Sequence, residues 1–289
     1  MELKVTSYHV DDLGVASVKF NRPGRGNSWT KRTLAEFRWL MQTADDDPAV
    51  RVIVVSGEGK QFCVGADYAA LDHYTAGDKN YVASVDPQGL ARPGHGVRPE
   101  YEHELVWLWG MRKPVIAAIN GACAGIAVAI AAFCDLRYAV AGAKLTTAAA
   151  RLGLPAEYGL SWVLPRLVGM TAAADILLTG RIVLAEEALR MGFLNAVFGV
   201  AEFESRTTEI ARSMAKTVSP IAAMTTKRQL YADLMNGDVG ASVEVSKRLI
   251  GELQRHPDFR EGVHALMARQ DAAFAPLPAG LQSESGSSP

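Results

Sequence analysis

Residues 113–135 read KPVIAAINGACAGIAVAIAAFCD. The aliphatic run 115–119 lies between Pro114 and the pair Asn120-Gly121, a pattern typical of a buried strand that ends in a turn. Residues from about 124 to 133 are small or aliphatic and carry no charge, which predicts a helix that is buried on most sides. The sequence therefore predicts a strand–turn–helix unit inside a larger protein.

The start of this predicted helix is rich in small residues, which let another backbone or a ligand come close. They are Gly121, Ala122, Ala124, Gly125 and Ala127. A helix N-terminus has free N–H groups and a partial positive charge, so it suits an anion that develops during a reaction. An ordinary core unit with glycines for packing explains this stretch alone equally well.

The composition favours a globular protein. The chain has 289 residues, of which 49% are hydrophobic, and a net charge of −1. This length suits one large or two small domains, and the neutral balance gives no support for nucleic-acid binding. No apolar run reaches the roughly 20 uninterrupted residues of a membrane span, and the N-terminus lacks the apolar region of a signal peptide. We expect a cytoplasmic protein without a membrane partner.

Strand and helix patterns alternate through the first part of the chain. A hairpin is expected over residues 2–20, a helix from Ser28 or Thr30 to about 43, a buried strand over 50–56 and another strand over 137–140. The segments 202–216, 221–234, 242–250 and 258–274 have helical periodicity with no strands between them. The order indicates an α/β fold followed by a helical C-terminal region.

Residues 69–104 form a long excursion with many glycines and prolines. A loop of this length is usually functional or disordered, and this one is a candidate cover for a site. His73, His95 and His103 lie in or beside it, but their spacing fits no metal-ligand motif, so we interpret them as solvent-exposed histidines. The three cysteines, Cys63, Cys123 and Cys134, also fit no zinc pattern and suggest reduced core thiols.

Several short motifs occur together in a specific order. They are Asn21-Arg22-Pro23 with Asn27-Ser28, Phe62-Cys63-Val64-Gly65-Ala66-Asp67, KPVIAAING at 113–121, Cys134-Asp135 and LPRLVG at 164–169. With these motifs the chain resembles the crotonase superfamily, also called the enoyl-CoA hydratase/isomerase family, along nearly all of its length. The resemblance implies an α/β spiral of ββα units over 1–200, with the acyl-CoA site, and a helical trimerisation region over 201–274. We expect residues 275–289 to be disordered.

The resemblance also implies the site. Family members bind acyl-CoA thioesters and hold the thioester oxygen with two backbone N–H groups, which by similarity belong here to Ala66 and Ile126. Fixed donors of this kind stabilise an enolate oxygen. Asp67 is expected to be structural, as a cap of the next helix. No metal and no cofactor other than the coenzyme A of the substrate is expected.

The chain departs from the family hydratases at two positions. Those enzymes use two glutamates to activate water, and the matching residues here are Ala129 and Ala149. Glu157, in the segment PAEYGLSWVLP, instead matches the single glutamate of the family Δ3,Δ2-enoyl-CoA isomerases. Leu154, Leu160 and Trp162 could desolvate its carboxylate and raise its pKa. A surface glutamate that favours the start of the next helix is the alternative.

Further binding residues are expected from the chemistry of the substrate. The phosphates of coenzyme A need cations, and the candidates are Arg22, Arg25 and Lys227. Backbone groups near Arg25 and Ala66 are the better candidates for contacts with adenine and pantetheine. Tyr101, Trp107 and Trp109 are candidates to line an acyl pocket with Trp162, although core packing explains them equally well.

The sequence leaves three functions open. The first is an enoyl-CoA isomerase with Glu157 as its base. The second is a hydratase or hydrolase with relocated groups, either Glu157 alone or a loop histidine such as His73 or His103. The third is a non-catalytic acyl-CoA binder or trimeric scaffold. The resemblance implies a homotrimer or a dimer of trimers.

Overall fold

The structure, a computed structural model, describes residues 1–67, 69, 72, 76–77 and 89–279. Its centre is a six-stranded sheet with the order β1-β2-β3-β4-β6-β9. The strands are β1 (Thr6–Val10), β2 (Val15–Phe20), β3 (Val52–Gly57), β4 (Val115–Ile119), β6 (Leu136–Val140) and β9 (Ala196–Phe198). The pair β1–β2 is antiparallel, as the expected hairpin requires, and the other neighbours are parallel. This confirms the predicted α/β class.

A second, smaller sheet lies beside the first. It contains β5 (Cys123–Ala124), β7 (Lys144–Thr146) and β8 (Val183–Leu184). Two isolated parallel bridges extend the same pattern, Trp29 with Ala66 and Cys63 with Cys123. The chain thus passes repeatedly from a strand of the large sheet, through an extended segment beside the small one, into a helix, as in β4–β5–α5 (α5, Ile126–Phe133). This is the repeated ββα unit that the resemblance implies.

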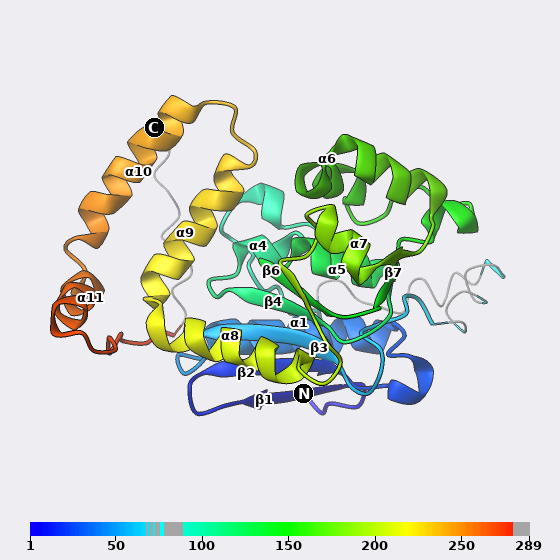
Figure 1. Ribbon diagram of the computed structural model, residues 1–289, viewed down its shortest axis with the longest axis horizontal. Coiled ribbons are helices and arrows are strands. Elements are labelled where there is room, and N and C mark those ends of the chain that lie inside the picture. The colour runs from blue at the N-terminus through cyan, green and yellow to red at the C-terminus, as the bar shows by residue number, and fades with distance from the viewer. Residues whose placement is uncertain (68, 70–71, 73–75, 78–88, 280–289) are drawn as a thin grey trace.

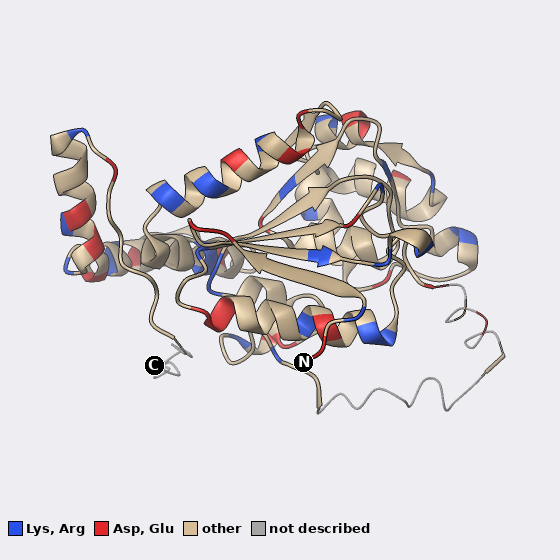
Figure 2. Cartoon of the chain, turned by 90° about the horizontal axis from the view of Figure 1, so that it is seen from below, with Lys and Arg blue, Asp and Glu red and all other residues tan. Residues whose placement is uncertain are grey.

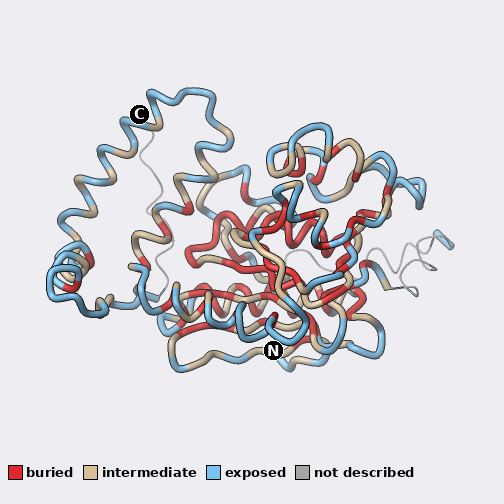
Figure 3. Tube along the Cα trace, in the orientation of Figure 1, coloured by how far each residue is buried: buried red, intermediate tan, exposed pale blue. Residues whose placement is uncertain are grey.

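The large sheet is covered on both faces. One face packs on the main core together with α1 (Lys31–Asp46), which begins at the Thr30 cap as expected, and with α5, all of whose residues are buried. The other face packs Val15, Val52, Ile116 and Tyr138 against α8 (Phe203–Thr217). Strand β4 is buried at every residue because it is central and covered on both sides. Figures 1 and 3 show this layering and the burial concentrated in it.

Of the C-terminal helices, the first packs on the core and the last two extend away from it (Figure 1). The three helices are α9 (Pro220–Asp233), α10 (Val239–Leu253) and α11 (Pro257–Ala268). Helix α10 has no buried residue, and Val239, Val243 and Ile250 on it are exposed (Figure 3). The helix predicted over 258–274 ends six residues early, where Arg269 adopts the left-handed conformation that often terminates helices.

The expected start of the disordered tail needs correction. The tail does not become disordered at 275, because Leu277 is 7% exposed and the Pro278 carbonyl accepts a hydrogen bond from Arg112; residues 280–289 lie outside the described part. Helix α6 (Leu160–Thr179) is long and apolar enough, by composition, to cross a membrane, although a non-helical Gly169 breaks it. One such helix is weak evidence for a membrane span.

Figure 2 shows both signs of charge interspersed over the molecule.

Candidate active site

Ala66 and Ile126 occupy matching places on two adjacent segments. Cys63 and Cys123 pair in a parallel bridge, and each candidate donor follows its cysteine by three residues. In both segments the residue before the donor is a glycine with positive φ, +90° at Gly65 and +56° at Gly125. A Cβ on Gly65 would lie 3.1 Å from the Ala124 carbonyl oxygen, so the two turns are in contact and the first needs glycine.

Both backbone N–H groups are without an acceptor in the part of the chain that the structure describes. Around Ala66 the neighbouring groups are used, since Trp29 N–H donates to the Gly65 carbonyl and Asp67 N–H donates to the Trp29 carbonyl. Ile126 is the first residue of α5, where the N–H has no partner within the helix and the helix dipole is positive. The Ile126 side chain is 6% exposed and packs in the core. The pair therefore has the properties of an anion-binding site.

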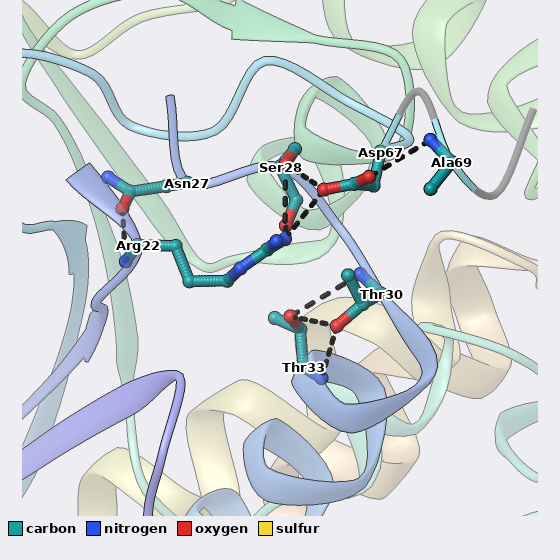
Figure 4. A network of polar contacts seen from close by, with 7 residues as sticks. All are labelled: Arg22, Asn27, Ser28, Thr30, Thr33, Asp67 and Ala69. Atoms are coloured by element: carbon teal, nitrogen blue, oxygen red, sulfur yellow. Dashed lines mark hydrogen bonds and ion pairs between the residues drawn. The ribbon is translucent and has the colours of Figure 1, made fainter. Parts of the chain in front are cut away.

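Asp67 fixes the turn after Ala66 (Figure 4). Its carboxylate accepts hydrogen bonds from Ser28 Oγ at 2.7 Å, from Arg22 Nη1 at 2.9 Å and from the Ala69 N–H at 3.1 Å. The Ser28 hydrogen bond, with the bonds from Ala69 and Arg22, outweighs burial and lowers the pKa of Asp67. These contacts agree with the structural role expected of Asp67.

The three cationic candidates for the phosphates have different surroundings. Arg22 is committed to Asp67 and to the Ser28 carbonyl, at 2.8 Å, so its charge is already paired. Lys227 does not fit the expectation, because its side chain is 5% exposed and its ammonium lies 2.8 Å from Asp135 and 3.0 Å from the Lys113 carbonyl oxygen. Arg25 is exposed, and no ion pair involves it within the described residues. It remains the best placed of the three.

Glu157 lies in the turn between the 3₁₀ segment η4 (Ala149–Leu152) and α6. Its side chain is half-buried, without a hydrogen bond or ion pair in the described structure, and burial raises its pKa. The next residue, Tyr158, has φ +52°, which is uncommon for a bulky side chain and is found more often at functional sites. The turn is tight, since the Glu157 carbonyl accepts a hydrogen bond from Leu160 N–H at 2.9 Å.

The Glu157 turn lies against α5, the helix that begins with Ile126. A Cβ on Gly159 would lie 3.5 Å from the tip of the Phe133 ring, and Phe133 is the last residue of α5. An eight-residue helix is about 12 Å long, and its side chains lean toward its N-terminus. The Glu157 turn and the Ile126 N–H therefore belong to neighbouring parts of the structure, joined by the contact of Gly159 with Phe133.

The two positions of the hydratase glutamates are apolar. Ala129 lies one turn after Ile126 and is fully buried, and Ala149 is 4% exposed. Neither provides a proton donor or acceptor. Among the described residues, Glu157 is the carboxylate of the turn packed against α5 that makes no hydrogen bond or ion pair, whereas Asp135, just after α5, is bound by Val115, Lys227 and Tyr231.

Tyr101 and Trp107 do not line an open pocket, because both are completely buried in the main core. Trp107 packs on Phe37 with ring centroids 5.7 Å apart. Trp162 is only partly buried and remains a candidate wall residue. Trp109, which is 2% exposed, lies between Trp162 and Tyr101. Its ring centroid is 5.8 Å from that of Trp162 and 6.2 Å from that of Tyr101.

Sequence reasoning missed Tyr231. Its ring stacks on Trp109 with centroids 4.5 Å apart, and its hydroxyl donates to Asp135 at 2.7 Å. The available signal was the spacing of Lys227 and Tyr231, which places both on one face of α9, where both bind Asp135. This spacing does not identify Asp135 as the shared partner, because Asp135 lies far away in the sequence.

The histidines and cysteines have the following surroundings in the structure. His103 is exposed as expected, but His95 lies between Arg38 and Arg92, and its pKa is lowered by burial and by these two cations. His73 lies outside the described residues, as does most of the 69–88 part of the excursion. All three cysteines are free and buried. Among the described residues no group of side chains could hold a metal ion.

Comparison with known proteins gives consistent matches. A family model described as enoyl-CoA hydratase/isomerase matches residues 11–276. The chain is 29% identical to the 1,2-epoxyphenylacetyl-CoA isomerase of Escherichia coli, over 92% of this chain and 96% of that one. It is 35% identical to a probable enoyl-CoA hydratase of Mycobacterium leprae, over 76% and 72%. The crystal structure of a probable enoyl-CoA hydratase/isomerase from Mycobacterium abscessus superposes with a TM-score of 0.79 at 30% identity, over 94% and 100%.

Proposed function

The chain belongs to the enoyl-CoA hydratase/isomerase family, and from that premise we propose that it moves the double bond of an enoyl-CoA from Δ3 to Δ2 with one carboxylate. The observation that carries the proposal is the state of Glu157. A half-buried carboxyl with a pKa raised by burial, and with no cation of the described residues beside it, is suited to accept and return a proton. An isomerase needs only one such group.

In the proposed reaction, Glu157 and the two backbone donors act on the same thioester. The Glu157 carboxylate takes a proton from C2 of the Δ3-enoyl thioester, and the electron pair of that C–H bond forms a dienolate with negative charge on the thioester oxygen. The N–H groups of Ala66 and Ile126 donate to this oxygen. The Glu157 carboxylic acid then returns the proton to C4, which leaves the double bond between C2 and C3 and restores the carbonyl. No water or other reactant is consumed.

Hydration of the same substrate class is disfavoured by the surroundings. Adding water across a double bond needs groups that position the water and transfer protons. The two positions where family hydratases carry these groups are occupied here by the buried Ala129 and Ala149.

Exposed Arg25 is the cation proposed to contact the phosphates of coenzyme A.

A parallel assay of two substrates tests the proposal. A Δ3-enoyl-CoA gains the absorbance of the conjugated thioester when it is isomerised, whereas crotonyl-CoA loses it when it is hydrated. We expect turnover of the Δ3 substrate to be the faster by a wide margin. Faster hydration would identify a hydratase, and calorimetric binding without either reaction would identify a non-catalytic acyl-CoA binder; both results contradict the proposal.

A further inference from the structure

A small, partly open cavity lies between the end of α1, the loop 92–97, the end of α4 (Trp107–Gly110) and α9. Its volume is about 40 Å³, whereas one water molecule needs roughly 10–15 Å³ by the same kind of measure. The charged or titratable residues that line it are Asp45, Asp46, Arg92, His95, Arg112 and Arg228. None of these residues belongs to the candidate active site.

Two of the three arginines have carboxylate partners. Arg112 Nε lies 3.5 Å from Asp45, and its Nη2 lies 3.5 Å from Asp46. Arg92 Nη2 lies 3.5 Å from Glu102. Both aspartates of the lining therefore pair with Arg112, and Asp45 also acts through its charge on the third arginine, Arg228, without forming an ion pair with it.

Arg228 is the exception. Its Nε atom is buried and has no hydrogen-bond acceptor, and no ion pair involves this residue in the described part of the chain. Burial lowers the pKa of this guanidinium, but an arginine stays protonated in proteins. A buried donor left unsatisfied is costly, and more so when it carries charge. Among the described residues, Arg228 is thus the lining arginine whose guanidinium makes no ion pair and whose buried Nε lacks an acceptor.

We propose that this cavity binds one small inorganic anion, of the size of chloride, with Arg228 Nε as a ligand. The volume admits a monatomic anion or a few waters and excludes a nucleotide or an acyl group. The anion would complete the polar contact between α9 and the core, next to the contact that Lys227 makes with Asp135. It would thereby help to hold the C-terminal helices in place.

Crystals of the full chain soaked in sodium bromide locate the anion directly. We expect an anomalous difference peak within hydrogen-bonding distance of Arg228 Nε, and none in crystals of the Arg228→Gln variant. Only water at Nε, or a carboxylate from a second copy of the chain, would overturn the proposal.

Thermal unfolding provides the measurement in solution. Chloride is compared with gluconate, which is too large for the cavity, at equal ionic strength. The wild type and an Arg248→Gln control, whose exposed arginine pairs with Glu252, should melt at a higher temperature in chloride, as expected of a ligand that binds only the folded state. Arg228→Gln should melt equally in both salts. A bromide peak without chloride-dependent stabilisation would mean an adventitious ion and would also overturn the proposal.

Discussion

Glu157 has a raised pKa because its carboxyl is half-buried and no cation of the described chain stabilises its charge. Burial favours the neutral acid, so the catalytic carboxylate forms only at a pH above that of an ordinary glutamate, about 4.3. We predict that kcat/KM falls as the pH is lowered, with a midpoint clearly above that ordinary value. A pH–rate profile checks this, and a midpoint at or below 4.3 would argue that the base is solvated or paired with a cation.

Ile126 allows a backbone donor to be removed with little damage to its helix. Proline is well tolerated at the first position of a helix, where the N–H has no partner within the helix. The Ile126→Pro variant should keep its fold and lose roughly 10²–10³-fold in kcat, the usual effect of deleting one oxyanion donor.

Ile126→Val is the matched control, because it trims the same buried side chain but keeps the N–H. Its kcat should stay close to that of the wild type. Equal losses in both variants would assign the effect to packing and would remove Ile126 from the proposed oxyanion site.

At the scale of elements, α9 is attached to the core through Asp135. This carboxylate accepts hydrogen bonds from Val115 N–H at 2.6 Å, from Lys227 at 2.8 Å and from Tyr231 at 2.7 Å. Lys227→Met leaves part of a buried charge uncompensated, so we predict a loss of about 3–5 kcal/mol in the free energy of unfolding.

Lys216 gives the comparison for that measurement. It also pairs with an aspartate, Asp271 at 2.6 Å, but its side chain is 52% exposed, against 5% for Lys227. Chemical denaturation of Lys216→Met should show a change within about 1 kcal/mol. Similar small losses in both variants would mean that the Asp135 contact does not anchor α9.

The sequence predicts elements best where one periodicity dominates. The strand 115–119 has the predicted bounds, because an apolar run between turn residues leaves little choice. Helix ends are less certain, as α11 shows. Residues of the site that lie in sequence motifs could be named, but the burial of Lys227 and the stacking of Tyr231 on Trp109 depend on how α9 packs, which no local pattern specifies.

At the scale of the whole molecule, the C-terminal helices α10 and α11 expose many apolar side chains. Val239 is 81% exposed and Ile250 56% exposed on a helix without a buried residue, and Leu266 and Met267 on α11 are about as exposed as Val239. Apolar surface of this extent commonly marks an interface. We predict a solution mass of three or six times the 31.0 kDa of the chain, measured by light scattering on a sizing column. A monomeric mass would contradict the trimer proposal.

The fold class follows from the alternation of strands and helices, and the ββα spiral from the resemblance. The position of Glu157 relative to Ile126 could not be predicted from sequence spacing, since it depends on the turn at Tyr158 and Gly159 packing against Phe133. The burial of Tyr101 and Trp107 likewise reflects their place in the main core, whereas an aromatic residue in the sequence suits a pocket wall and a core equally.

The most direct test of the account compares the wild type with Glu157→Gln, using turnover of a Δ3-enoyl-CoA and calorimetric affinity for a saturated acyl-CoA on the same preparations. Glutamine keeps the size of the side chain but cannot accept the C2 proton. We predict that turnover falls by about 10²-fold or more, while affinity and melting temperature stay near those of the wild type. Unchanged turnover in Glu157→Gln would contradict the claim that this carboxyl transfers the proton.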